Sequence, residues 1–192
     1  KTGAPRRVDR DGQAVRLAAL MGLPVKYVWT HDAFRVGEDG PTHQPVEQEA
    51  QIRLLEKMSN LEGKRSMLVL RPADAAETTV AWKLALENTE GPSGLILSRQ
   101  TIPDLPAVGA SRYDDALGSA RGAYIVRPVD GKPDLVLVAD GSEVAVLVEV
   151  AEMLAESRKL KVQVVSAPSE GLFREQSPDY QHSVLPRPVP AV

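Results

Sequence analysis

The sequence predicts an α/β protein made of two doubly wound, mostly parallel sheets. Short apolar segments with strand character alternate with segments of helical periodicity in residues 14–100, and the same alternation returns in residues 119–192. Strands that alternate with helices are typical of a parallel sheet covered by helices. Between the two halves, residues 101–118 carry Pro103, Pro106 and Gly109 with little periodicity, which predicts a linker between two domains.

The elements of the first domain follow from apolar runs and end signals. Residues 1–13 are polar and basic without a period, so we predict a flexible tail or an unrelated segment there. Gly22 is a stop signal for the preceding helix, and Pro45 suits the first turn of the helix that it opens. Asp74, with Glu77 three residues later, resembles a capping box. The expected order is helix 14–21, strand 24–29, helix 45–58, strand 66–70, helix 75–88 and strand 94–97.

The second domain repeats the alternation. We expect strands over residues 122–129, 133–139 and 161–165 and a helix over residues 143–157, entered through the tight turn at residues 140–143. Residues 168–190 are rich in proline and are expected to form a looped tail.

Composition narrows the class of protein. A chain of 192 residues with 43% hydrophobic and 26% charged residues has an ordinary globular balance. The formal net charge of −3 and the absence of a long apolar run lead us to expect neither a nucleic-acid nor a membrane partner. The chain has no cysteine, which excludes thiolate catalysis and fits a cytoplasmic protein.

The candidate chemistry lies in residues 31–44, which follow the first expected strand. His31 and His43 flank a polar segment that includes Asp32 and Asp39, with glycines that allow sharp bends. Carboxyl ends of parallel strands form ligand crevices, so His31, Arg71 and Arg99, each after a strand, are expected to be neighbours.

Imidazoles can hydrogen-bond sugar oxygens and move protons near neutral pH, and an arginine can bind a phosphate with two hydrogen bonds. Metal binding by His31, Asp39 and His43 is the competing interpretation, although their spacing matches no established ligand signature. Solvated histidines and an ion-paired Arg99 are the simpler alternatives.

Several other polar and aromatic residues have structural explanations. Arg71 is expected to tie its strand end to the next loop, and Asp74 to cap a helix. An anion site at residues 140–142 is a weaker hypothesis than simple helix capping. The aromatic side chains expected in the core are Tyr27, Trp29 and Trp82.

The string Thr30-His-Asp32, followed by Val36-Gly-Glu-Asp-Gly-Pro-Thr-His-Gln-Pro-Val-Glu47, closely resembles the signature of transketolases, which are thiamine-diphosphate enzymes. Further segments resemble the family in the family's order, over about residues 14–188. They are Val15-Arg-Leu-Ala-Ala-Leu20, Leu70-Arg-Pro-Ala-Asp74, Leu97-Ser-Arg-Gln100, Gly141-Ser-Glu-Val144, Val164-Val-Ser166 and Ser183-Val-Leu-Pro186.

The resemblance implies roles for four residues. His31 would help to hold the sugar phosphate, and Asp39 would contact a sugar hydroxyl near the new bond. His43 would hydrogen-bond the two-carbon donor fragment and Arg99 would bind the substrate phosphate. The implied reaction transfers a two-carbon ketol unit from a ketose phosphate to an aldose phosphate, in the pentose phosphate pathway, with His43 and His31 as the catalytic residues.

The resemblance also implies thiamine diphosphate with Mg²⁺ or Ca²⁺, and a cytoplasmic homodimer. It covers part of the pyrimidine-binding domain and most of the carboxyl-terminal domain. The family's diphosphate-binding domain has no counterpart here, so no cofactor-binding or metal-binding residue is assigned and the chain alone is expected to be inactive. Asp140 stands where the family usually has threonine. The alternatives are a non-catalytic interaction or dimerisation module and a related enzyme such as deoxyxylulose-phosphate synthase.

Overall fold

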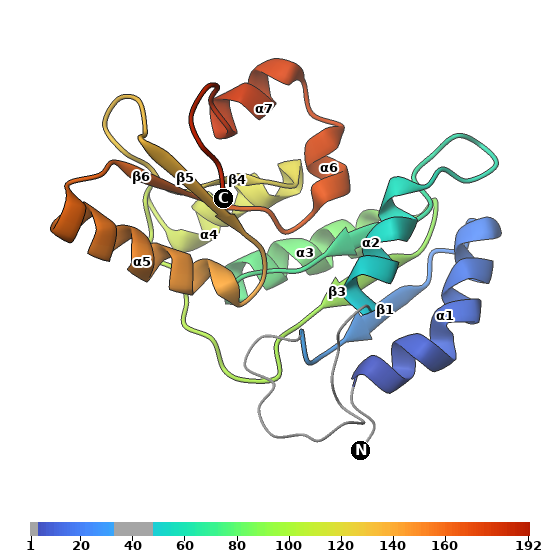
Figure 1. Ribbon diagram of the computed structural model, residues 1–192. Coiled ribbons are helices and arrows are strands. Elements are labelled where there is room, and N and C mark those ends of the chain that lie inside the picture. The colour runs from blue at the N-terminus through green and yellow to red at the C-terminus, as the bar shows by residue number, and fades with distance from the viewer. Residues whose placement is uncertain (1–3, 33–47) are drawn as a thin grey trace.

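A computed structural model of the protein describes residues 4–32 and 48–192. Within these ranges helices and strands alternate along the chain, and the parallel pairs β1·β3, β2·β3 and β5·β6 confirm the predicted α/β class (Figure 1). The elements are α1 (Ala4–Leu20), β1 (Lys26–Trp29), α2 (Gln48–Lys57), β2 (Leu68–Leu70), α3 (Ala75–Glu87), β3 (Ser93–Ile96), α4 (Arg112–Ala116), η1 (Leu117–Arg121), β4 (Tyr124–Arg127), β5 (Leu135–Ala139), α5 (Glu143–Arg158), β6 (Val162–Ser166), α6 (Glu170–Arg174) and α7 (Pro178–Val184).

The first sheet has the strand order β1-β3-β2, and both of its pairs are parallel. Its strands are apolar on both faces because helices cover both faces. Along β2, Val69 points to the side where Val15 of α1 and Ile52 of α2 pack, whereas Leu68 and Leu70 pack with α3. This two-sided burial is what the unbroken apolar run of β2 indicated.

The second sheet has the order β4-β6-β5, in which β5 and β6 are parallel and β4 runs antiparallel to β6. On one face Val162 and Val164 pack with Val144 and Val148 of α5. On the other face Val136 and Val165 lie in a cluster with Val184 of α7. The sheet is therefore also doubly wound, with one antiparallel edge strand.

Helix α3 lies between the two sheets (Figure 1), with α4 and η1 packed against it. Ala73, which precedes α3, is buried in the same cluster as Tyr124 and Val144 of the second unit. The two units therefore share a continuous core, and polar side chains at this boundary lose their contact with water.

The local structure differs from the predictions in four places. Helix α1 begins at Ala4, so residues 4–13 are helical and not a flexible tail. Gly12 weakens this helix locally, but the burial of Val15, Ala18 and Ala19 stabilises it. Residues 112–116 of the predicted linker form α4, which Ser111 caps by accepting from the Asp114 backbone N–H.

The third difference concerns one aromatic side chain. Trp82 is 37% exposed on the outer side of α3 rather than in the core. Trp29 is buried as expected, and Tyr27 stacks on it with ring centroids 5.5 Å apart. The proline-rich tail also contains more regular structure than expected, namely α6 and α7.

Candidate functional site

The carboxyl ends of β1, β3 and β2 meet at one edge of the first sheet, as the sequence predicted. Trp29 at the end of β1 pairs with Ile96 at the end of β3, and the Leu97 backbone N–H donates to the Trp29 carbonyl at 2.8 Å. The segments that begin with His31 and Arg99 therefore leave neighbouring strands at the same edge. This arrangement supports a shared site for the two side chains.

His31 occupies an unusual backbone conformation directly after β1. Its φ is 70°, in the left-handed region that side chains other than glycine rarely adopt. The side chain is half-buried, and its Nδ1 lies 3.0 Å from the Thr30 hydroxyl. The ring therefore lies at the edge with a fixed local partner.

Of the other predicted site residues, Arg99 is among the described residues. Arg99 is exposed in the turn after β3, where the Ser98 hydroxyl donates to the Gln100 carbonyl at 2.8 Å. Asp39 and His43 lie outside the described residues. Within 4–32 and 48–192, no three His, Asp or Glu side chains are grouped as metal ligands.

The most connected residue at this edge is Arg71, at the end of β2. Its side chain is 5% exposed, and its Nη2 donates to the Asp32 carbonyl at 3.0 Å, to Asp32 Oδ2 at 3.1 Å and to Glu143 Oε2 at 2.6 Å. Its Nη1 donates to Asp140. The prediction that Arg71 is structural agrees with these contacts, but it ties together two sheets rather than a strand and its following loop.

A second arginine extends these contacts into a charge cluster. Arg53 on α2 pairs with Asp140, with Glu56 at 3.3 Å and with Glu49 at 3.6 Å. Glu49 also lies 3.8 Å from Arg71. We call this group the charge cluster; its members are Asp32, Glu49, Arg53, Glu56, Arg71, Asp140 and Glu143.

The cluster shifts the titration of its members. Burial by itself lowers the pKa of Arg71, but the surrounding carboxylates, Asp140 foremost, outweigh it and raise that pKa. Burial, and then repulsion from Asp140, raises the pKa of Glu49. Arg71 therefore remains charged, as a buried guanidinium held among carboxylates must.

Asp140 was expected only at a capped helix start or a weak anion site. Its carboxylate instead pairs with Arg71 and Arg53, so the anion at the start of α5 is the protein's own side chain. The signal in the sequence was that Asp140 stands where the family usually has threonine. The arginines that it contacts can be identified only from the packing of the two sheets.

A second buried network joins α3 to the other sheet. The Tyr124 hydroxyl donates to Glu77 Oε1 at 2.7 Å and accepts from Arg112 Nη2 at 2.8 Å, while Arg112 Nε donates to Asp74 Oδ2 at 2.6 Å. Asp74 also caps α3 by accepting from the Glu77 backbone N–H, as predicted. Burial raises the pKa of Glu77, and burial together with the nearby Glu77 raises the pKa of Tyr124.

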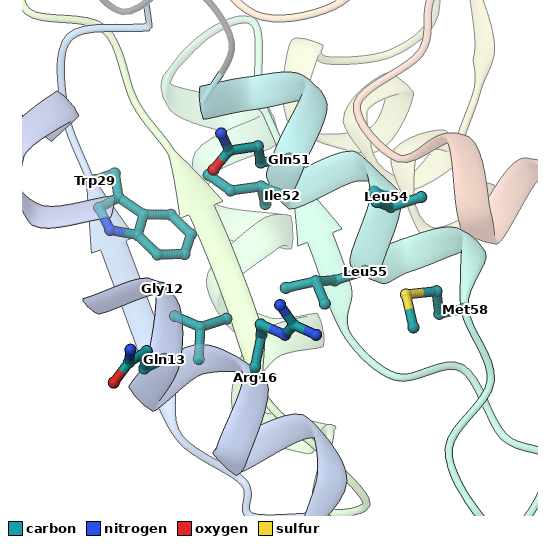
Figure 2. Close-up of a pocket in the computed structure, with 10 residues that line it drawn as sticks. Gly12, Gln13, Arg16, Trp29, Gln51, Ile52, Leu54, Leu55 and Met58 are labelled. Atoms are coloured by element: carbon teal, nitrogen blue, oxygen red, sulfur yellow. The ribbon is translucent and has the colours of Figure 1, made fainter. Parts of the chain in front are cut away.

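A cavity of about 390 Å³ lies between α1 and α2 (Figure 2). Most of its lining is apolar, and the polar side chains Gln13, Arg16 and Gln51 approach it from the two helices. None of His31, Arg71 and Arg99 lines it. The cavity reaches the edge of the sheet at Trp29 but does not include these three side chains.

Comparison with known protein families assigns both halves of the chain. Residues 8–104 match the transketolase pyrimidine-binding domain, and residues 122–192 match the transketolase-like C-terminal domain. The chain belongs to the transketolase family. The first match begins at residue 8, so part of the segment 1–13, which we predicted to be a flexible tail or an unrelated segment, belongs to the family region.

Individual transketolases agree with this assignment. The chain is 48% identical over 178 residues to the transketolase of Halalkalibacterium halodurans and 45% identical over 177 residues to that of Bacillus subtilis. These alignments cover 93% and 92% of this chain and 25% of each relative. The chain thus spans about a quarter of the length of the curated relatives that it matches.

Solved transketolase structures share the fold. The enzyme from Leishmania mexicana superposes with a TM-score of 0.81 at 42% identity, covering 96% of this chain and 25% of that one. A Pichia stipitis mutant in complex with fructose 6-phosphate also gives 0.81, at 39% identity, covering 97% of this chain and 25% of that one. The described residues therefore have the fold of the corresponding part of these transketolases.

Proposed function

We propose that the protein to which this segment belongs is a transketolase that moves a two-carbon ketol unit from a ketose phosphate to an aldose phosphate, with thiamine diphosphate as cofactor. The observation that carries the proposal is the match of both domains, in order, to the transketolase family. Related Pichia stipitis structures are described as complexes with fructose 6-phosphate and sedoheptulose 7-phosphate, which supports sugar phosphates as substrates.

The proposed site residues follow the resemblance and the chemistry of each side chain. His31 and Arg99 would bind the substrate phosphate, His43 would hydrogen-bond the donor fragment and Asp39 would contact a sugar hydroxyl. The pairing of β1 with β3 supports a joint role for His31 and Arg99, because both follow strands that end at the same edge. A guanidinium and an imidazole at such an edge can hold a phosphate by charge-assisted hydrogen bonds.

Thiamine diphosphate, when bound, supplies the carbanion chemistry of ketol transfer. The described residues do not offer a group of acidic and histidine side chains suited to Mg²⁺ or Ca²⁺. As the family resemblance implies, we propose that the metal and the diphosphate are held mainly by parts of the full-length protein outside this segment. The residues of this segment would bind and orient the sugars and exchange protons with them.

We further propose that residues 14–100, together with the part of α1 before residue 14, form the pyrimidine-binding domain and residues 119–192 the C-terminal domain, joined by residues 101–118. A cytoplasmic homodimer in the pentose phosphate pathway is the proposed context. Exposed apolar side chains on and near α1 and α2, which include Leu17, Leu20, Met21, Leu54 and Met58, offer a surface for subunit contact. The described helices include none long and apolar enough to cross a membrane.

The test uses the full-length protein with thiamine diphosphate, magnesium, a ketose phosphate and an aldose phosphate. Replacing His43 with Ala should lower the rate of ketol transfer by about a hundredfold or more. His182→Ala is the matched control, because His182 is exposed on α7 and belongs to no proposed site. Equal activity of both variants and the wild type would favour a non-catalytic module.

Two further measurements separate the alternatives. A panel of donor and acceptor substrates distinguishes transketolase from a related enzyme such as deoxyxylulose-phosphate synthase, because ketol transfer between sugar phosphates is specific to the former. The 192-residue chain assayed alone should show no detectable transfer. Robust turnover by the chain alone would contradict the proposed location of the cofactor.

A further inference from the structure

The left-handed backbone of His31 needs an external support. A residue with a side chain that adopts such a φ is strained by about 1 to 3 kcal/mol, and surrounding contacts must hold it there. Nδ1 of the ring lies 3.0 Å from the hydroxyl of the adjacent Thr30. A firmer support is available at the next residue, Asp32, which is 4% exposed.

Asp32 is fixed by groups from two other parts of the chain. Its carboxylate Oδ2 accepts from the Ser142 hydroxyl at 2.7 Å and from Arg71 Nη2 at 3.1 Å. Its backbone carbonyl accepts from the same Arg71 nitrogen at 3.0 Å. Both the side chain and the backbone carbonyl of Asp32, the residue after His31, are therefore anchored.

The anchor joins the two domains, because Arg71 belongs to the first and Ser142 to the second. Ser142 lies 110 residues from Asp32, at the start of α5, and its neighbour Glu143 binds Arg71 at 2.6 Å. Between β5 and α5 the chain passes against Arg71: Gly141 has φ +58°, and a Cβ there would lie 2.6 Å from Arg71 Nε. The Gly141 backbone N–H also donates to the Arg71 carbonyl at 3.0 Å.

We propose that Ser142 is a positioning residue for substrate binding: through its hydrogen bond to Asp32, and together with Arg71, the C-terminal domain holds His31 in the orientation that binds the sugar phosphate. This inference rests on the proposed function, and it gives the C-terminal domain a part in substrate recognition. Ser142 itself touches no substrate in this account, because its hydroxyl is directed to Asp32.

The alternative is that the hydrogen bond of Ser142 only stabilises the domain boundary. The protein contains a second hydrogen bond of the same kind, which serves as a control. The Ser169 hydroxyl donates to Glu56 Oε1 at 2.7 Å, the same distance as between Ser142 and Asp32. Both serines are buried and both carboxylates belong to the first domain. The contact of Ser169, however, lies on α2 and not next to His31.

The experiment compares Ser142→Ala with Ser169→Ala in the full-length holoenzyme. KM is measured for an aldose phosphate acceptor and for the same aldose without phosphate, with thermal unfolding as a parallel readout. We expect Ser142→Ala to raise KM for the phosphorylated acceptor about five- to tenfold, as loss of a charge-assisted hydrogen bond allows, and to leave kcat within about twofold. KM for the unphosphorylated aldose should not change.

Ser169→Ala should lower the unfolding temperature as much as Ser142→Ala and leave both KM values unchanged. Ser142→Thr, which keeps the hydroxyl, should restore KM. In a His31→Ala background, Ser142→Ala should add nothing further, because the residue through which it acts is absent. If Ser142→Ala does not fold, Arg71→Lys provides the same comparison, since it weakens the second contact to Asp32.

The inference and the proposed function fail in different ways. A wild-type protein without ketol transfer overturns the proposed function, and the inference with it. An active wild type in which Ser142→Ala and Ser169→Ala change KM equally, or in which the effect persists without His31, overturns the inference alone.

Discussion

Replacing Arg71 with Met tests whether the charge cluster stabilises the protein through that one guanidinium. Methionine has a similar length and can fill the space, but it offers nothing to the carboxylates of Asp32, Asp140 and Glu143. The substitution therefore leaves three acids facing one another across the domain boundary. Of these three, Asp140 keeps its ion pair with Arg53.

The expected loss follows from burial. The side chains of Arg71 and Asp32 are 5% and 1% exposed, and removing one partner of such a buried pair costs about 3 to 5 kcal/mol. Asp140 and Glu143 are 22% and 34% exposed, so water screens their share and adds little to this figure. For a chain of this size, the loss corresponds to a fall in Tm of about 10 °C.

The assay is thermal and urea unfolding of the purified 192-residue chain. Arg174→Met is the matched control, because Arg174 pairs with Glu170 at 2.5 Å but its side chain is 58% exposed. Its loss should stay below about 0.5 kcal/mol. Adding Asp32→Asn to Arg71→Met should recover part of the stability, since the buried carboxylate then no longer needs a cation.

A loss of less than about 1 kcal/mol for Arg71→Met, or a loss equal to that of the control, would refute the reasoning. Such a result would mean that the carboxylates find other cations or water without the arginine. A double variant less stable than Arg71→Met alone would also contradict it.

Three further predictions concern the boundary between the two sheets. Tyr124→Phe should lower the free energy of unfolding by about 1.5 to 3 kcal/mol in urea titrations, because it removes a 2.7 Å hydrogen bond to the buried Glu77, whereas Tyr113→Phe at an exposed position should have little effect. Burial raises the pKa of Glu77 in the folded protein, so the stability that this group contributes is full below about pH 4 and declines as the pH rises through its folded pKa. The free energy of unfolding lost in Glu77→Gln should therefore become smaller between acidic and neutral pH. A loss that becomes larger over this range would contradict the prediction. Gly122→Ala should lower the free energy of unfolding by about 3 kcal/mol in thermal or urea unfolding, because Gly122 has a φ of +86° and a Cβ there would lie 2.2 Å from a backbone nitrogen of α6. Gly131→Ala is the control: Gly131 has a φ of +76° but no atom nearer than 3.8 Å, so the loss should be only about 1 kcal/mol.

Much of the fold could be predicted from local patterns. The apolar runs gave β2, β3 and β6 to within two residues at either end, and Asp74 with Glu77 correctly marked the start of α3. Two of the errors share one cause. Residues 4–13 of α1 and the whole of α4 contain few apolar residues, and the packing of these helices against neighbouring elements stabilises them.

The predicted site divides in the same way. The placement of His31 and Arg99 after strands that end at one edge followed from the alternation of strands and helices, and the pairing of β1 with β3 agrees with it. The burial of Asp32, by contrast, could not be predicted from the neighbouring residues, because an aspartate in a polar segment is expected to be solvated. Its partners Arg71 and Ser142 are distant in the sequence.

The sequence by itself determined the α/β class, the transketolase resemblance and the residues that carry the proposed chemistry, because strand and helix periodicity and motif wording are local properties of the chain. Only the tertiary structure decided which charges meet. Arg71, Arg53 and five carboxylates come together because the two sheets and the helices that cover them pack against one another. This packing buries Arg71 and Asp32, and a buried charge is stable only beside its opposite, so the packing of the sheets, not the local sequence, selects the partners.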